Sequence, residues 1–305
     1  MGRRNKKGRN ITGIVIIDKP TGRSSNHVLQ QVKRLFDAKK AGHTGALDPL
    51  ATGVLPICLG DATKVSSYLL DADKRYHVTC QLGVVTDSGD SDGAVLNTSE
   101  TPTFSEQDVA NLLPEFMGEQ DQVPPMFSAL KYQGQPLYKL ARQGIEVERK
   151  SRRITIYDIQ LLSITTESFT LDVHCSKGTY IRTLVEDISH KLGSGGHVIM
   201  LRRVSAAGYD LEQAITIEQL EEIAEQGLQH LDDELLAAEN ALPDWPSIHA
   251  TDDMVDALRH GQTIKVNQDF DGEKVRLFDA NKQFIGLGEM TEQGIVAPKR
   301  VFVAV

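Results

Sequence analysis

Apolar and polar residues alternate along one segment in the first third of the chain. One side carries Tyr76, Val78, Cys80, Leu82 and Val84, and the other carries His77, Thr79 and Gln81. Successive side chains of a strand point to opposite faces, so this alternation predicts a half-buried β-strand. A continuous apolar run over residues 11–17 predicts a short buried strand, and further strands are predicted at about 152–164 and 169–175.

Two other segments repeat apolar residues with the period of a helix. The first follows Ser24 or Ser25, either of which is a favourable N-cap, and its stripe consists of Val28, Leu29, Val32, Leu35 and Phe36. The second follows Thr179, the expected N-cap, and its stripe consists of Ile181, Leu184, Val185, Ile188 and Leu192. Residues 41–53 and 86–93 are rich in Gly, Thr, Ser and Asp, and this composition predicts loops.

The length and the segment boundaries indicate more than one domain. A chain of 305 residues predicts about two domains. Residues 1–10 are basic and lack an apolar pattern, so we expect a flexible basic arm. The acidic, helical segment 210–246 ends in LPDWP, a plausible boundary, and residues 248–305 contain strand-like runs separated by turns. We therefore expect a main domain over 11–246 and a small β-rich domain over 248–305.

The charge is strongly segregated, although the formal net charge is −9. Residues 1–40 contain eleven Lys or Arg against two Asp, and residues 131–153 contain seven Lys or Arg against two Glu. Residues 210–256, by contrast, contain fourteen Asp or Glu and no Lys or Arg. Two separate basic segments favour a polyanionic partner such as a nucleic acid, while the acidic remainder keeps the molecule soluble.

The composition also excludes several classes of protein. Hydrophobic residues make up 40% of the chain and charged residues 25%, as in an ordinary globular protein. No apolar run approaches the roughly 20 residues that a membrane span needs, and no signal region is seen, so we expect a cytoplasmic protein. The three cysteines, Cys58, Cys80 and Cys175, have no CxxC spacing and favour neither a disulfide framework nor a zinc site.

The clearest candidate for chemistry is a loop that contains Asp48. General motifs such as GxSxG, HExxH, GxGxxG and the Walker sequence are absent. Asp48 precedes Pro49, whose ring restricts the preceding residue to extended conformations, and glycines at 42, 45 and 53 allow a ligand to approach the backbone. Without further information, an Asp before Pro is more often a turn residue than a nucleophile.

Longer motifs resemble a known family. GIVIIDKPTGRSS is followed by AGHTGALDPLATGVLPICLGDATK, KRYHV, VPPMFSALKYQGQPLYKLARQG, CSKGTYIRTLVEDI and LRRVSAAGYD. These motifs, in this order over about residues 11–210, closely resemble the bacterial TruB-type tRNA pseudouridine synthases. The resemblance implies an α+β fold: a mixed, largely antiparallel sheet with flanking helices, and a small β-rich C-terminal domain of PUA type that binds RNA.

The activity implied by the resemblance is isomerisation of uridine to pseudouridine at position 55, in the T-loop of tRNA, without cofactor or metal. The family's nucleophile matches Asp48, which acts after the base is flipped out. Arg182 is expected to pair with Asp48, and Tyr76 to stack on uracil and assist removal of the C5 proton. The residues expected to contact the substrate or support its loop are His43, Tyr76, Tyr180, Leu201 and Lys19.

The same resemblance assigns RNA binding to an insertion at about 124–152. Its basic residues are expected to contact the tRNA backbone, namely Lys131, Arg142, Arg149 and Arg152. The implied partner is the T-arm stem-loop of tRNA, bound by a monomer without an obligatory protein partner. Two alternatives remain open: a non-catalytic protein that binds or folds tRNA, and a synthase that depends on a guide RNA.

Overall fold

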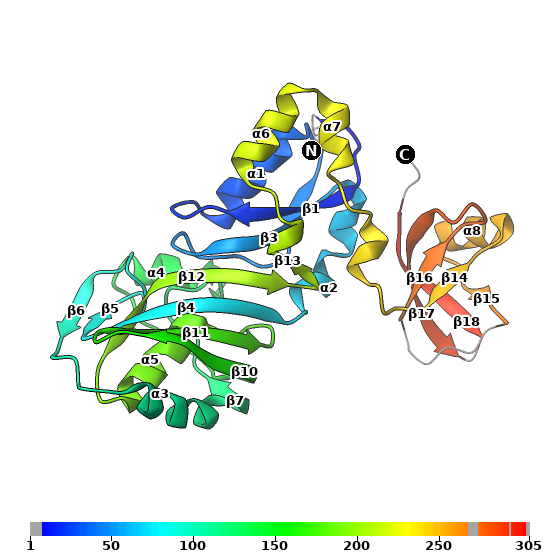
Figure 1. Ribbon diagram of the computed structural model, residues 1–305. Coiled ribbons are helices and arrows are strands. Elements are labelled where there is room, and N and C mark those ends of the chain that lie inside the picture. Colours follow the sequence, from blue (N-terminus) through cyan, green and yellow to red (C-terminus); the bar gives the residue numbers. More distant parts are fainter. Residues whose placement is uncertain (1–7, 268–273, 293, 303–305) are drawn as a thin grey trace.

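The computed structural model describes residues 8–267, 274–292 and 294–302, and these contain two separate sheets (Figure 1). The larger sheet has the strand order β1-β3-β12-β4-β11-β10-β7, with β2 added beside β3 and β13 beside β12. Its strands are β1 (Gly13–Lys19), β2 (Ala41–His43), β3 (Thr52–Leu59), β4 (Lys74–Leu82), β7 (Gly118–Gln122), β10 (Arg152–Ile164), β11 (Ser168–Cys175), β12 (Gly196–Ala206) and β13 (Tyr209–Asp210). The described strands of this sheet pair antiparallel except where β12 meets β3.

The smaller sheet lies near the C-terminus and has the order β14-β16-β17-β18-β15. Its strands are β14 (Ser247–His249), β15 (Ile264–Lys265), β16 (Lys274–Phe278), β17 (Phe284–Glu292) and β18 (Ile295–Val301). Two hairpins stand apart from both sheets, formed by β5 (Val84–Thr86) with β6 (Val95–Thr98) and by β8 (Lys131–Tyr132) with β9 (Gln135–Pro136). The expected α+β class, with a mixed, largely antiparallel sheet and a β-rich C-terminal part, is confirmed.

Helices lie between the strands along the described chain. The α-helices are α1 (Ser25–Leu35), α2 (Ser66–Leu70), α3 (Glu106–Leu112), α4 (Leu137–Ala141), α5 (Ile181–Lys191), α6 (Ile217–Glu225), α7 (Leu228–Asp233) and α8 (Asp252–Arg259). Short 3-10 helices are η1 (Gly60–Lys64), η2 (Leu113–Phe116), η3 (Leu211–Gln213) and η4 (Ala238–Ala241). In the described part of the chain, none of these helices is long and apolar enough to cross a membrane.

The alternating pattern of β4 produces the core that supports the site. Tyr76, Val78, Cys80 and Leu82 are buried while the intervening residues are half-exposed, so the predicted half-buried strand is confirmed. The buried side packs against α5, whose stripe contributes Ile181, Leu184, Val185 and Ile188. A second cluster of buried side chains joins α1, α6 and α7 to β1 and β3. Figure 1 shows these three helices above β1.

The two sheets share apolar packing. Leu287 and Phe302 belong to the same buried cluster as Ile14 and Val54 of the large sheet. Lys64 reinforces this contact because its Nζ donates to the carbonyl of Val301 at 2.8 Å. The same cluster contains Ala62 and Val65, so the C-terminal sheet is joined to the large sheet through η1 and the residues that follow it.

Of the two predicted N-caps, the one of α1 is confirmed and the one of α5 is wrong. Ser24 caps α1 by accepting from the backbone N–H of His27 at 3.2 Å, as expected. Thr179, however, does not cap α5: the N-cap is Tyr180, and the Thr179 hydroxyl donates to the carbonyl of Ser176 at 3.0 Å. Residues 1–7 of the predicted basic arm lie outside the described residues. Arg9 lies inside them and pairs with Asp232 at 2.5 Å.

Candidate active site

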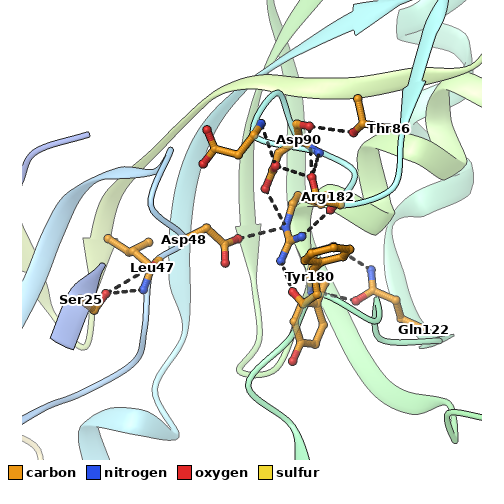
Figure 2. A network of polar contacts seen from close by, with 11 residues as sticks. Ser25, Leu47, Asp48, Thr86, Asp90, Gln122, Tyr180 and Arg182 are labelled. Carbon is orange, nitrogen blue, oxygen red and sulfur yellow. Dashed lines mark hydrogen bonds and ion pairs between the residues drawn. The ribbon is translucent and has the colours of Figure 1, made fainter. Parts of the chain in front are cut away.

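The loop that contains Asp48 is held from below by two side chains. Ser25, at the start of α1, accepts from the N–H of Leu47 at 2.7 Å and donates to its carbonyl at 3.1 Å (Figure 2). Lys19 is completely buried, and its Nζ donates to two carbonyls that closely follow Asp48, at 3.3 Å to Pro49 and 2.5 Å to Ala51. These bonds fix the backbone around Asp48 before any ligand binds.

Asp48 pairs with Arg182, as predicted. The Asp48 Oδ2 lies 3.0 Å from Nε of Arg182, which comes from the first turn of α5 (Figure 2). No hydrogen bond to Asp48 Oδ1 is found in the described part of the chain, and 39% of this side chain is exposed. The carboxylate is therefore oriented by one oxygen and keeps the other available for reaction.

The guanidinium of Arg182 is itself enclosed by other groups. It is 4% exposed and donates to the carbonyls of Ser88 and Phe127, the latter at 2.7 Å. A second carboxylate, that of Asp90, lies 3.7 Å from its Nε. Asp90 is buried and accepts from the Ser88 hydroxyl at 2.5 Å. Arg182 thus lies within ion-pair distance of two carboxylates, those of Asp48 and Asp90.

The sequence reasoning did not find Asp90. Residues 86–93 were interpreted only as an acidic, turn-rich loop, and a Ser/Gly/Asp turn carries no sign of which carboxylate faces inward. Only tertiary contacts show which way Asp90 faces. The backbone of Gly89 and of Ser91 bonds to the backbone of Val198 on β12, at 3.0 Å each, and these bonds bring the loop over α5.

Burial and charge act in opposite directions on the acid. Desolvation raises the pKa of Asp48, and the adjacent guanidinium of Arg182 opposes this change. Desolvation likewise raises the pKa of Tyr76, so its hydroxyl is protonated at neutral pH. The site therefore combines an ionisable carboxyl group with a neutral phenol.

Two hollows meet at the Asp48–Arg182 pair. The smaller, of about 340 Å³, is lined by the predicted uracil-contacting residues Tyr76, Tyr180 and Leu201. The larger, of about 790 Å³, lies on the other side and includes His43, Tyr138 and Arg142. The structure thus brings Asp48, Tyr76, Arg182, Tyr180 and Leu201 together in one hollow, while His43 lies on the neighbouring one.

Tyr180 is held in place by a residue that no motif pointed to. Gln122 of β7 accepts from the N–H of Tyr180 at 2.8 Å and donates to its carbonyl at 3.1 Å. A side chain from a distant strand therefore bonds the backbone of Tyr180, the N-cap residue of α5, whereas Thr179 was expected to be the cap. Such a contact depends on pairing of β7 with β10, which the local sequence does not reveal.

The structure places three further predicted residues. Lys19 was expected to contact the substrate or support its loop, and its complete burial lets it support the loop. Burial, followed by the charge of Arg203, lowers the pKa of His43, so its imidazole is neutral at pH 7. Arg149 bonds within its own segment, to Glu146 at 2.9 Å and to the carbonyl of Pro124 at 3.4 Å, and its expected RNA contact stays a prediction.

The other basic residues of the insertion are more accessible. Lys131 is exposed on the β8–β9 hairpin, and Arg142 is exposed with its guanidinium 5.6 Å from the ring centre of Tyr138. Arg142 lines the larger hollow and Arg152 lines the smaller one. Cationic side chains of the insertion therefore flank the carboxylate from both sides.

The fold and site together define an α+β class of enzyme in which a carboxylate–arginine pair lies beside an aromatic hollow. The model of the TruB family pseudouridylate synthase N-terminal domain matches residues 33–181. Two further TruB models match residues 182–243, for a tRNA pseudouridylate synthase B C-terminal domain, and 246–302, for the pseudouridine synthase II TruB C-terminal region. The chain belongs to the TruB family of pseudouridine synthases.

Related proteins match over nearly their whole length. A tRNA pseudouridine synthase B of Nitrosococcus oceani is 51% identical over 295 residues, covering 97% of this chain and 96% of the relative. A tRNA pseudouridine synthase B of Shewanella amazonensis is 50% identical over 309 residues, covering 98% of each.

Solved structures share the fold. One from a Cbf5-Nop10-Gar1 complex has a TM-score of 0.73 and 26% identity, covering 95% of this chain and 85% of that one. Another, from an H/ACA RNP bound to a substrate RNA containing 2'-deoxyuridine, has a TM-score of 0.71 and 24% identity, covering 96% and 85%. The latter likeness concerns the fold alone.

Proposed function

We propose that this protein isomerises uridine to pseudouridine at position 55 in the T-loop of tRNA, with Asp48 as the nucleophile. The observation that carries the proposal is the 3.0 Å contact between Asp48 and Arg182 at the junction of the two hollows. It occurs in a chain that is 51% identical, over 97% of its length, to a tRNA pseudouridine synthase B.

The chemistry follows from the arrangement of these residues. Asp48 attacks the flipped nucleoside, the bond between C1′ and N1 breaks, and the base turns. C1′ then joins C5 and the bond to Asp48 breaks, which restores the carboxylate. A covalent step by a carboxylate divides one difficult displacement into two easier ones. The proton on C5 leaves and N1 gains one, so the atoms balance without a co-reactant.

The hollow lined by Tyr76, Tyr180 and Leu201 receives the uracil ring. Aromatic rings stack on a flipped base and compensate part of the few kcal/mol that unstacking costs. Tyr76 stacks and its oxygen assists removal of the C5 proton. Arg182 keeps Asp48 ionised and oriented, which favours the reactive geometry.

Binding of the T-arm depends on phosphate contacts. Lys131, Arg142 and Arg152 of the insertion provide cations around the site, and the C-terminal sheet supplies a further RNA-binding surface of PUA type. The chain acts as a monomer in the cytoplasm and needs no other protein.

The direct test is incubation of the purified chain with an unmodified T-arm stem-loop, followed by mapping of pseudouridine. We expect one modified position with the wild-type protein and none with Asp48→Asn, which keeps the shape of the side chain but removes the nucleophilic charge. An Asp158→Asn variant, changed on the outer face of the sheet, serves as the matched control and retains activity.

The same assay separates the alternatives. Full modification by Asp48→Asn would contradict the assigned nucleophile. Tight binding with no product would indicate a protein that only binds or folds tRNA. Activity that appears only after a second RNA is added would indicate guide-dependent modification.

A further inference from the structure

Arg203 is a buried cation of the smaller hollow that the mechanism above does not use. Arg203 lies on β12 and is only 1% exposed. It still lines that hollow, together with Tyr76 and Leu201. Its Nε donates to the carbonyl of Val54 at 2.7 Å, and its Nη2 donates to the carbonyl of Gly45 at 3.2 Å. Two backbone carbonyls thus fix the guanidinium.

No carboxylate forms an ion pair with Arg203 in residues 8–267, 274–292 and 294–302. Removing a cation from water without an anionic partner costs several kcal/mol, and hydrogen bonds to neutral carbonyls recover only part of this. An unneutralised buried charge therefore attracts any negative charge that arises nearby.

The surroundings add to the positive potential. Titratable groups near Arg203 are Lys19 on β1, His43 on β2, and Lys74 and Tyr76 on β4. Burial lowers the pKa of Lys19 and of Lys74 to about 8, so both retain most of their charge at pH 7. The acids that face these neighbours are Asp48 and Asp92 beside Lys19, Asp71 and Asp73 beside Lys74, and Asp48 beside Tyr76, and the Cys175 thiol lies near Lys74 and Tyr76.

Tyr76 is the neighbour that faces the reacting base. Arg203 and Tyr76 are directly opposite each other in the antiparallel register of β12 and β4, so their side chains lie on the same face of the sheet. Both residues line the smaller hollow. A negative charge on the Tyr76 oxygen, or on a ring stacked against it, therefore develops beside the buried guanidinium.

We propose that Arg203 supplies a fixed charge that stabilises the anion that forms on the uracil ring and on Tyr76 during isomerisation. The inference rests on the proposed function. When the C1′–N1 bond breaks, the electron pair passes to N1 and spreads over the ring oxygens. After C1′ joins C5 and the bond to Asp48 breaks, the Tyr76 hydroxyl gives its proton to N1 and its oxygen takes the C5 proton, so the neutral phenol is restored. A fixed charge that needs no reorganisation is suited to stabilising such transient anions.

The test compares Arg203→Gln and Arg203→Lys with Arg202→Gln. Arg202 is the adjacent residue, but it pairs with Asp18 at 2.7 Å and lines neither hollow. We expect Arg203→Gln to lower kcat roughly a hundredfold with little change in KM. Arg203→Lys should recover most of the turnover at neutral pH, and Arg202→Gln should behave like the wild type. A kcat of Arg203→Gln equal to that of the wild type would overturn the proposal.

A pH series keeps the proposal testable if Arg203→Gln does not fold. A lysine at this position is expected to lose its proton at a pH well below that of an exposed lysine, as do buried Lys19 and Lys74, whose pKa values are about 8. The activity of Arg203→Lys relative to the wild type should therefore fall between about pH 6.5 and about pH 9.5. Lys19, His43, Lys74 and Tyr76 titrate in both proteins, and they add to the change in the ratio, because the charge at position 203 lowers the pKa of each.

A ratio that stays constant over this range would contradict a role for the charge. A wild-type protein that forms no pseudouridine would instead contradict the proposed function, and this inference with it. An active wild type with unaffected Arg203 variants would contradict the inference alone.

Discussion

At the scale of single residues, the arginine shared by Asp48 and Asp90 controls the site. Arg182 lies 3.0 Å from one carboxylate and 3.7 Å from the other. Asp90 and the carbonyls of Ser88 and Phe127 also hold the guanidinium. The direction of the Asp48 carboxylate therefore depends on the groups that hold Arg182.

The first prediction concerns Asp90→Asn. The variant keeps the shape of the side chain but removes the charge that fixes Arg182, so kcat should fall by up to about a hundredfold while tRNA binding changes little. Single-turnover pseudouridine formation and a filter-binding titration measure the two effects. Asp158→Asn controls for loss of a carboxylate elsewhere. Unaltered turnover in Asp90→Asn would show that Arg182 needs only one acid.

The second prediction concerns pH. Burial raises the pKa of Asp48, so the ionised form, and with it kcat, should be lost on acidification at a higher pH than for an exposed aspartate. Arg182 opposes this rise, and Arg182→Met should therefore move the acid limb of the rate profile to still higher pH. Arg75→Gln, at an arginine that pairs with Asp172, is the control. An acid limb unchanged by Arg182→Met would contradict the electrostatic role.

At the scale of elements, strand β12 assembles the site. It pairs antiparallel with β4 and parallel with β3, and it contributes Leu201 and Arg203 to the smaller hollow. The parallel contact is tight because Gly53 of β3, with φ of +101°, lies against the backbone of Arg203. Close approach of these two strands requires a residue without a side chain.

The third prediction tests this contact. A Cβ on Gly53 would come within 2.1 Å of the Arg203 carbonyl oxygen, so Gly53→Ala should separate β3 from β12 and destabilise the fold by several kcal/mol. Gly22→Ala is the matched control, because Gly22 has φ of +75° but nothing within 4 Å of an added Cβ. Its cost should be about 1 kcal/mol, from the backbone alone. Equal unfolding midpoints for the two variants in urea would contradict the steric argument.

At the scale of the whole molecule, charge segregation is compatible with a tRNA substrate despite the net charge of −9. The basic insertion flanks the two hollows through Arg142 and Arg152, whereas Arg149 is occupied within its own segment. The proposed phosphate contacts are therefore assigned to the cations that line the hollows and to the exposed Lys131.

The fourth prediction follows from that assignment. Neutralising Lys131, Arg142 and Arg152 together, each to Gln, should weaken tRNA binding and reduce the slope of log K against log salt by up to about three, at nearly one per phosphate contact. Arg149→Gln should leave the slope unchanged. Arg153→Gln should also leave the slope unchanged, because Arg153 lies near Glu119 and Asp121 of strand β7. An unaltered slope in the triple variant would exclude the insertion as an RNA clamp.

The periodic segments and the chemical motifs could be predicted from the sequence alone. The alternation of β4, the stripes of α1 and α5 and the Ser24 cap depend on neighbouring residues and on burial of one face, so local pattern determines them. Asp48, Tyr76, Arg182, Tyr180 and Leu201 were found through motif resemblance, and the structure gathers all five around one hollow.

Tertiary structure decided which partners these residues meet. Asp90 reaches Arg182, Gln122 holds Tyr180, and Arg203 lies opposite Tyr76 because strands and loops distant in sequence pair in one register. It also decided that Lys19 is buried and that Arg149 is engaged. The sequence alone determined which side chains are available and which faces of the elements are apolar. Their charges and pKa values depend on burial and neighbours, which exist only once the sheet has formed.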